Sequence, residues 1–360
     1  MQKRLLLFYL LILLLIIAII GLGVAFYRHP ISTQKEPLVL TISKGDSIEE
    51  IAKKLTAKGC ASQIYAVLFM AKWLGKLDQI KAGEYAIPAY TTFRQLLKML
   101  RSGQVLLHKI TFPEGRTFAQ ILRIIAVEPQ LTHTFKDHSA EEIMAIIGHP
   151  AEYPEGLFYP DTYLFSVGTT DTQILRLAYD LMQKKINQAW AHRALDLPYE
   201  NVNEALIVAS LIERESKIDA ERPMVAGVIL RRLKIGMRLQ IDASVLYGLQ
   251  DKTQTVLKQT DLRIDTPYNT YTRYGLPPTP IAMPGMPAIN AALHPTSGSA
   301  LYYVAKGDGS HIFSDTLAQH HVAVSAYRKA RIVKHPVDWR QCISASLLLS
   351  RFQQSPLRAK

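Results

Sequence analysis

The sequence predicts an α+β fold, with one apolar N-terminal helix, a small α+β subdomain and a larger mixed α+β domain. Three observations lead to this prediction. Residues 5–26 carry no charged side chain, a strand-turn-helix pattern recurs within residues 38–125, and longer helical patterns alternate with short strands after residue 150. We therefore divide the chain into residues 1–4, a helix over 5–26, a linker over 27–37, a subdomain over 38–125, a larger domain over 126–335 and a tail over 336–360.

The apolar run from Leu5 to Phe26 predicts a transmembrane helix. It is long enough to cross a hydrocarbon core of roughly 30 Å. The run exceeds the usual core of a cleaved signal peptide, and no clear Ala-x-Ala site follows, so we expect it to stay as an anchor. Lys3 and Arg4 precede it, which predicts a cytoplasmic stub over residues 1–4 and the rest of the chain outside the cytoplasm.

Small strand-turn-helix units make up the predicted subdomain. A strand over Leu38–Ile42 leads through a turn to a helix that begins with the capping box Ser47-x-x-Glu50. A related pattern recurs over Thr111–Ile121, and a looser copy starts at Tyr85. Such units bury their apolar faces only by packing on one another, so we expect a compact module. Its pattern resembles the LysM-like module of cell-wall proteins.

The larger domain contains two successive predicted helices. The first begins at Asn201, in a capping box with Glu204, and continues through the apolar run Ala205–Ile212. The second has Pro223 in its first turn and ends at Gly236. After them we expect a strand over Arg238–Asp242, an ordered irregular loop over Tyr268–Pro287, a hairpin of Leu301–Ala305 with His311–Phe313, and a helix near 316–332.

Composition restricts the partners. The formal net charge of +12 suits either an acidic partner, such as anionic lipid or a polymer with carboxylates, or a merely solubilising surface. No basic stripe with interleaved aromatic residues appears, which argues against nucleic acid. Cys60 and Cys342 fall in different predicted regions and are interpreted as packing residues, although the sequence leaves open whether they are free. His311, His320 and His321 lack metal-ligand spacing, so we expect no metal and no cofactor.

One carboxylate stands where a carboxylate is costly. Glu213 follows the apolar run of the first helix, where desolvation favours the protonated form, and a held proton can be donated to a leaving group. Glu215 lies about 200° further round a helix, so the two carboxylates are not expected to share one cleft. The alternative is that Glu213 only marks where a core helix reaches the surface beside Arg214.

Five motifs resemble the endolytic murein transglycosylases of the YceG-like family. They are Glu155-Gly156-x-x-x-Pro160-Asp161-Thr162-Tyr163, Ala209-Ser210-Leu211-Ile212-Glu213, Gly236-Met237-x-Leu239-Gln240-x-Asp242, Tyr268-Asn269-Thr270-Tyr271 with Gly275-Leu276-Pro277-Pro278, and His311 with His320. The chain departs from the family's pattern at Ile241, Ala243 and Thr279.

The resemblance implies a single-pass protein of the inner membrane with its catalytic domain in the periplasm. Such a protein cuts nascent peptidoglycan glycan strands between N-acetylmuramic acid and N-acetylglucosamine, and thereby limits their length. The family's catalytic glutamate falls on Glu213 by its position in the motif. Penicillin-binding proteins and other cell-wall synthases are the partners that the resemblance suggests.

A lone acid suits a lytic transglycosylase. The C6 hydroxyl of the muramic acid is the nucleophile and forms a 1,6-anhydro end, so one residue can first give a proton and then take one. For sugar contacts we single out four polar side chains and one histidine beside the cleft, Gln240, Asp242, Asn269, Tyr271 and His320.

Three of these residues also have a purely structural interpretation. Asn269 would only tie down its own turn, Asp242 would cap the helix that starts near Ser244, and His320 would be a structural histidine.

Two other functions remain open at this point. A non-enzymatic, membrane-anchored scaffold would bind peptidoglycan through the LysM-like module. A hydrolytic muramidase would use water and would need Asp242 as its second carboxylate.

Overall fold

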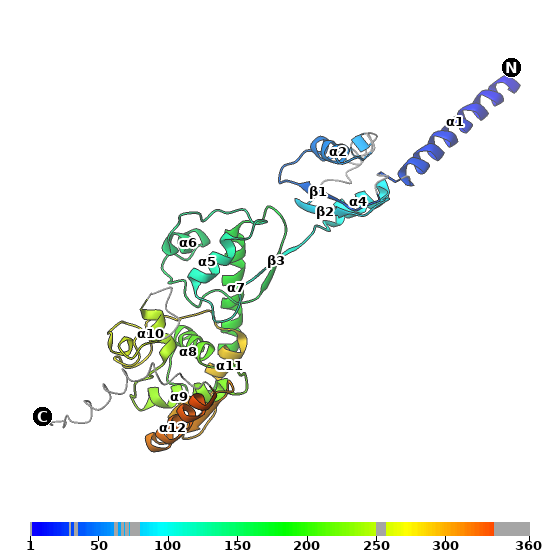
Figure 1. The fold of residues 1–360 in the computed structure, drawn as a ribbon. Coiled ribbons are helices and arrows are strands. Elements are labelled where there is room, and N and C mark those ends of the chain that lie inside the picture. The colour runs from blue at the N-terminus through cyan, green and yellow to red at the C-terminus, as the bar shows by residue number, and fades with distance from the viewer. Residues whose placement is uncertain are drawn as a thin grey trace. The chain divides into compact units, whose positions relative to one another are not determined.

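The computed structural model describes residues 2–28, 30–31, 35–60, 64–65, 68, 72, 80–249 and 257–334. It confirms a mixed α+β fold of helices and small antiparallel sheets (Figure 1). The elements up to residue 191 are α1 Gln2–Arg28, β1 Leu38–Ile42, α2 Ile48–Ala57, β2 Gly83–Ile87, α4 Phe93–Ser102, β3 His108–Thr111, α5 Phe118–Ala126, α6 Ala140–Ile147, β4 Thr162–Phe165 and α7 Asp171–Ala191. Those beyond it are α8 Val202–Glu215, α9 Arg222–Lys234, α10 Asp242–Gly248, the 3-10 turn η1 Asp261–Arg263, α11 Met286–Leu293, β5 Tyr302–Ala305, β6 His311–Ser314 and α12 Leu317–Lys334.

The chain folds into two compact units whose segments interleave along the sequence. The first unit contains residues 1–112, 122–150 and 162–177, and the second contains 113–121, 151–161 and 178–360. The domain limits expected from the sequence, at residues 38–125 and 126–335, differ in kind from these two interleaved units and stay predictions.

In the first unit, β1 pairs antiparallel with β2, with Leu38 opposite Ile87. Helices α2 and α4 pack against this pair, and the buried side chains include Leu40, Leu55, Tyr85, Phe93 and Leu100. The predicted capping box is confirmed: the Ser47 N–H donates to Glu50 Oε2 (2.6 Å), and the Glu50 N–H donates to Ser47 Oγ (3.2 Å). Strand-turn-helix order occurs three times, as β1–α2, β2–α4 and β3–α5, which confirms the repeat read from the sequence.

In the second unit, α8, α9 and α11 surround the largest apolar core, to which the run Ala205–Ile212 contributes. Asn201 caps α8, because its side chain accepts from the Glu204 N–H (2.9 Å). Only one of the two hydrogen bonds of the predicted capping box forms. The Glu204 carboxylate accepts from the Glu200 N–H (2.9 Å) and not from the Asn201 N–H. Pro223 lies in the first turn of α9, and the chain leaves that helix just before Gly236, as predicted.

The strand predicted over Arg238–Asp242 is wrong, because these residues form no strand and α10 already begins at Asp242. Gln240 has a φ of +54°, in the left-handed region, which interrupts an extended backbone. The local backbone groups are bound elsewhere: the Gln240 N–H donates to Thr270 O (3.1 Å), and the Ile241 N–H donates to Thr270 Oγ1 (2.8 Å).

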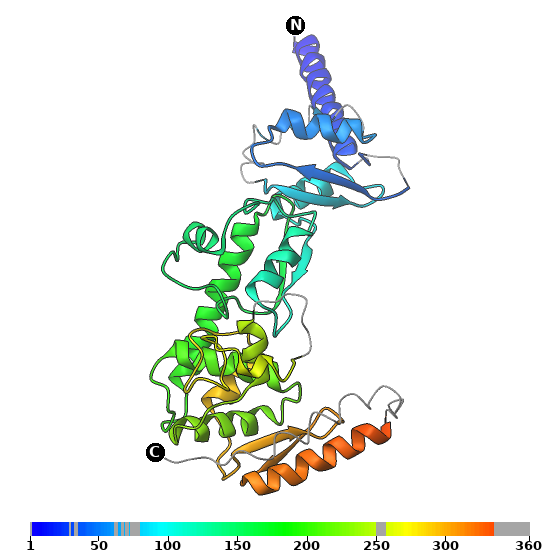
Figure 2. The same cartoon turned by 60° about the vertical axis from the view of Figure 1, so that its left-hand side comes forward.

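The predicted hairpin and the helix after it are confirmed. β5 pairs antiparallel with β6, with Tyr303 opposite Phe313, and α12 packs against both strands (Figure 2). Cys60 is buried with a free thiol, while Cys342 and the tail over 336–360 lie outside the described residues.

Residues 5–26 fall within the continuous helix α1. Within the described ranges, no helix meets the length and apolarity that a membrane crossing requires.

Candidate active site

A cleft of ≈ 880 Å³ lies in the second unit. Four of the five residues predicted to contact a sugar line it, namely Gln240, Asp242, Tyr271 and His320. Glu215 also lines this cleft, whereas Glu213 is not among its lining residues. The other side chains of the wall come from α9, β5, β6 and α12, and include Arg232, Tyr302, Tyr303, His311, His321 and Arg328.

Glu215 is the last residue of α8, so its carboxylate leaves the helix where the backbone turns away at Ser216. Tyr303 Oη donates to Glu215 Oε2 at 2.9 Å. Burial raises the pKa of Glu215 above its ordinary value; the Tyr303 hydrogen bond opposes this shift, and the neighbouring Asp242 reinforces it. A carboxyl group with a raised pKa holds its proton to higher pH than an ordinary one and can give it to a bound group.

Arg232 is a buried residue of the cleft lining that binds two backbone segments. Its Nη1 donates to Leu239 O (2.7 Å), while its Nε donates to Leu301 O (2.7 Å). The guanidinium also lies 5.2 Å from the centre of the Tyr302 ring. One side chain of α9 thereby fixes both the segment before α10 and the start of the β5–β6 hairpin.

Asp242 and Tyr271 form a polar pair at the exposed side of the cleft. Tyr271 Oη donates to Asp242 Oδ1 at 2.6 Å, and burial of the phenol raises the pKa of Tyr271. Asp242 does not cap a helix: the N-cap of α10 is Ile241, and Asp242 is the first helical residue. Its carboxylate remains available to a ligand at the exposed end.

Asn269 is fully buried and binds only its own loop. Its Nδ2 donates to Leu262 O (3.1 Å) and Ile264 O (2.7 Å), and its Oδ1 accepts from the Tyr271 N–H (2.8 Å). The loop-tying alternative therefore describes its contacts, and Asn269 acts on the cleft by holding the backbone of Tyr271.

His320 stacks on Tyr302, with ring centroids 5.2 Å apart. Its Nδ1 is buried and has no hydrogen-bond partner in the described part of the chain. Burial, with smaller effects from His321 and Arg232, lowers the pKa of His320. A neutral imidazole at the cleft wall offers a flat face and one nitrogen lone pair to a ligand.

Glu213 is held in a different place. Its side chain is 5% exposed, and Arg222 donates to it twice, from Nη1 to Oε2 (3.2 Å) and from Nη2 to Oε1 (3.0 Å). The Gly285 N–H donates to Oε2 at 2.9 Å. Burial raises the pKa of Glu213 despite the opposing Gly285 and Arg222. Glu213 and Glu215 thus have separate surroundings, as their helical spacing predicts.

Sequence reasoning gave no site role to four residues of the second unit. Glu215, Arg232 and Tyr303 carry the contacts above, and Glu155 is a buried acid whose pKa burial raises to about 7. Glu155 Oε1 accepts from the Phe118 N–H, and Oε2 accepts from Tyr247 Oη, each at 3.0 Å. Glu215 was considered but set aside because its helical position faces away from Glu213, and Glu155 opens one of the family-like motifs without having been given a role. Nothing in the sequence pointed to Arg232 or Tyr303.

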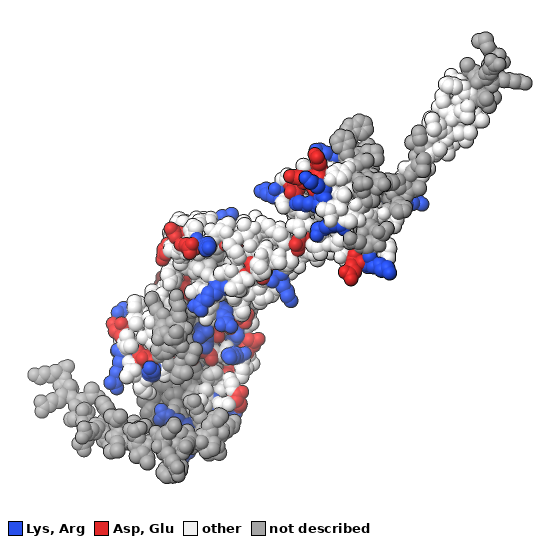
Figure 3. All heavy atoms as spheres, turned by 45° about the horizontal axis from the view of Figure 1, so that its top comes forward, with Lys and Arg blue, Asp and Glu red and all other residues white. Residues whose placement is uncertain are grey.

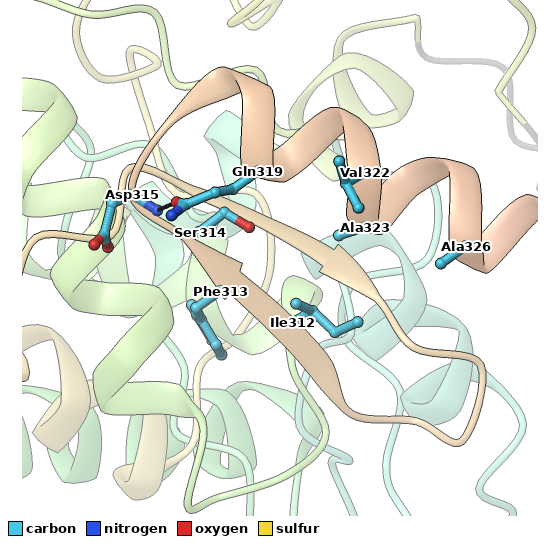
Figure 4. A pocket seen from close by; sticks show the side chains of 8 residues that line it. All are labelled: Ile312, Phe313, Ser314, Asp315, Gln319, Val322, Ala323 and Ala326. Carbon is cyan, nitrogen blue, oxygen red and sulfur yellow. Dashed lines mark hydrogen bonds between the residues drawn. The ribbon is translucent and has the colours of Figure 1, made fainter.

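Other hollows offer less chemistry. A groove of ≈ 500 Å³ between β6 and α12 is lined mainly by apolar side chains such as Ile312, Phe313 and Val322 (Figure 4). On the face drawn in Figure 3, lysine and arginine side chains are interspersed with acidic ones. In the described ranges, no cluster of three or more histidine, cysteine, aspartate or glutamate residues is arranged to hold a metal ion.

Comparison with known proteins agrees with the motifs. The model of the YceG-like family matches residues 40–326. The endolytic murein transglycosylase of Bacillus subtilis (strain 168) is 31% identical over 314 residues, which cover 81% of this chain and 85% of that protein. That of Streptococcus pneumoniae serotype 2 (strain D39 / NCTC 7466) is 28% identical over 309 residues, 76% of this chain and 55% of that protein. A crystal structure of a YceG-like protein from Listeria monocytogenes has a TM-score of 0.52 at 29% identity and covers 80% of this chain and 99% of that one.

Proposed function

This chain belongs to the YceG-like family, and from that premise we propose that it is an endolytic murein transglycosylase that cleaves peptidoglycan glycan strands within the cleft around Glu215. The observation that carries the proposal is the position of one protonatable carboxylate among polar and aromatic side chains that suit a sugar. The relatives that bear this name support the same activity.

For the acid there are two candidates, Glu213 from the motif and Glu215 from the cleft. We favour Glu215. The Glu213 carboxylate is enclosed by the Arg222 guanidinium and the Gly285 N–H, which stabilise its charged form and occupy both oxygens. Glu215 accepts a hydrogen bond from Tyr303 Oη and a weaker one from the Ala243 backbone, and it lines the cleft together with Asp242 and Tyr271.

In the proposed reaction, Glu215 protonates the glycosidic oxygen between N-acetylmuramic acid and N-acetylglucosamine, and the bond from C1 to that oxygen breaks. The C6 hydroxyl of the muramic acid attacks C1 and closes the 1,6-anhydro ring, and its proton passes to a base in the cleft. No water enters the product. Asp242, Tyr271 and Gln240 would bind sugar hydroxyl and acetamido groups, and His320 would contribute a flat face to the wall.

The second candidate function is a hydrolytic muramidase, because Asp242 lines the same cleft as Glu215 and would supply the second carboxylate. The two functions differ in whether water enters the product. Digestion of peptidoglycan in ¹⁸O-labelled water, followed by mass spectrometry, should give unlabelled anhydro ends with the native chain and no cleavage with Glu215→Gln. Labelled reducing ends would favour the muramidase, and no cleavage by the native chain would favour the peptidoglycan-binding scaffold.

We also propose that α1 anchors the protein in the inner membrane, with residues 1–4 in the cytoplasm and the catalytic unit in the periplasm. The charge-free run Leu5–Phe26 supports this, as do the exposed apolar side chains from Phe8 to Ile17. Action next to the membrane would suit cleavage of nascent strands and association with penicillin-binding proteins. A periplasm-specific reporter fused after Lys360 should be active, whereas activity of a cytoplasm-specific reporter there would contradict the orientation.

A further inference from the structure

At the cleft wall, both carboxylate oxygens of Glu221 contact His311. The His311 backbone N–H donates to Glu221 Oε1 (3.1 Å), and His311 Nδ1 lies 2.8 Å from Glu221 Oε2. Both side chains are largely buried, at 12% and 15% exposure. Glu221 precedes α9 at the N-cap position yet makes no capping hydrogen bond, so the carboxylate is committed to His311 and not to its own helix.

This contact determines the tautomer of the neutral imidazole. A carboxylate accepts hydrogen bonds but has no proton to give, so the proton between the two groups belongs to His311 Nδ1. The lone pair of the neutral ring is then on Nε2. Among the described residues, the hydrogen bonds of His311 involve its backbone N–H and Nδ1, and none involves Nε2. The ring is steadied on its sides by Tyr303, at 5.6 Å between centroids and 90° between planes, and by Phe313 at 6.4 Å.

His311 belongs to the same cleft as the proposed acid. Both residues line it, and Tyr303 links them, because its ring contacts the imidazole while its hydroxyl donates to Glu215. His311 and Glu215 also interact electrostatically. Glu221, from the turn before α9, contacts the imidazole directly. Other charged or titratable residues that line the same cleft are Arg232, Asp242, Tyr271, Tyr302, His320, His321 and Arg328.

From this arrangement we propose that His311 is a second catalytic residue, the base that takes the C6 hydroxyl proton, and that Glu221 is its positioning residue. The inference rests on the proposed transglycosylase function. Glu215 gives its proton to the glycosidic oxygen as the C1 bond to that oxygen breaks. The C6 oxygen bonds to C1, and its proton passes to His311 Nε2. The imidazolium then returns a proton to the Glu215 carboxylate through solvent, so both groups regain their starting states and no water is consumed.

The test uses the full chain and chemical rescue. His311→Ala should lower kcat about 10²-fold or more, the usual contribution of a general base. Free imidazole added to this variant should restore part of the lost rate, which a purely structural role would not allow. His294→Ala, at the exposed C-cap of α11, is the matched control and should show neither loss nor rescue. Full activity of His311→Ala, or a loss that imidazole leaves unchanged, would overturn the proposal.

A second measurement does not depend on turnover. Nitrogen NMR of histidine-labelled native chain should show His311 with its proton on Nδ1. Glu221→Gln should shift the proton to Nε2, because the amide can donate to Nδ1, and should lower kcat with little change in KM. A proton on Nε2 in the native chain would contradict the assignment even if His311→Ala failed to fold. Loss of activity in Glu215→Gln with a fully active His311→Ala would retain the proposed function and reject only this inference.

Discussion

Arg222 and Glu213 form a two-pronged ion pair in which both side chains are about 95% removed from solvent, with hydrogen bonds of 3.2 and 3.0 Å. The pair joins the end of α8 to the start of α9, and the Gly285 N–H extends it to the start of α11. Removing one partner of a buried ion pair strongly destabilises the fold, because the other charge then stays desolvated without a counter-charge.

We therefore expect Glu213→Gln to destabilise the fold, by about 3 kcal/mol, since Arg222 would lose its buried counter-charge. The specific activity of the folded fraction should stay close to that of the native chain. Urea unfolding measures the first effect and turnover per folded enzyme the second. Unchanged stability with abolished turnover would instead assign the acid to Glu213, as the motif alone predicts.

The sequence predicted much of this fold but could not choose between the two carboxylates. Asn201, Pro223 and Gly236 placed the ends of α8 and α9 through local backbone chemistry. Which carboxylate faces the cleft depends on distant contacts: Gly285 is 72 residues from Glu213, and Tyr303 is 88 residues from Glu215. Neighbouring residues carry no signal of such pairings.

Hydrogen bonds that the sequence does not reveal decide the local structure both in the segment Arg238–Asp242, where the predicted strand is wrong, and around Asn269, for which a sugar contact was predicted. The segment before α10 shows a strand-like alternation, but Arg232 and Thr270 bind its backbone and Gln240 adopts a left-handed conformation. Asn269 has the side chain of a sugar ligand, and only its three contacts within the loop reveal that it is used internally.

Tyr303→Phe should change the pH dependence of cleavage. The Tyr303 hydroxyl lowers the pKa of Glu215 by donating to the carboxylate, so its removal raises that pKa further. A general acid must be protonated, and activity is lost as pH rises through its pKa. The alkaline limb of the kcat profile should therefore move to higher pH in the variant. A limb that moves to lower pH, or stays in place, would contradict the role of Glu215.

Asp242→Asn distinguishes a sugar contact from a second catalytic carboxylate. Loss of one substrate hydrogen bond costs about 0.5–3 kcal/mol, so we expect kcat/KM to fall roughly tenfold to a hundredfold. Tyr271→Phe, which removes the hydroxyl that binds Asp242, should have a similar or smaller effect. Near-complete inactivity of Asp242→Asn together with ¹⁸O-labelled reducing ends would establish the hydrolytic alternative.

Arg232→Met should loosen the cleft without touching the acid. The variant removes the donors that hold Leu239 O and Leu301 O but keeps an apolar stem of similar length. We expect KM to rise more than kcat falls, because Gln240, which we propose to bind the sugar, loses its hydrogen bond from Arg232. The neighbouring Arg231 donates to other carbonyls, those of Ala300 and Thr296, so Arg231→Met serves as the control for general destabilisation. Equal effects of the two variants on KM would refute a specific role of Arg232.

Glu155 should make folding stability depend on pH. Burial raises its folded-state pKa to about 7 from an ordinary value of 4.5. Below pH 4.5 the carboxyl is protonated in both the folded and the unfolded chain, so the full stability is present. As pH rises towards 7 the unfolded chain loses the proton while the folded chain keeps it, and stability falls by an amount on the order of 3 kcal/mol before levelling off above pH 7.

Urea unfolding of the native chain and of Glu155→Gln at pH 5 and at pH 8 isolates this contribution. Glutamine keeps an acceptor for the Phe118 N–H and does not titrate, so the decrease in unfolding free energy between the two pH values should be smaller in the variant by up to about 3 kcal/mol. Other titrating groups affect both proteins alike and cancel in the comparison. An equal decrease in the two proteins would show that Glu155 is already ionised in the folded chain at pH 5, and that its hydrogen bonds from Phe118 and Tyr247 outweigh its desolvation.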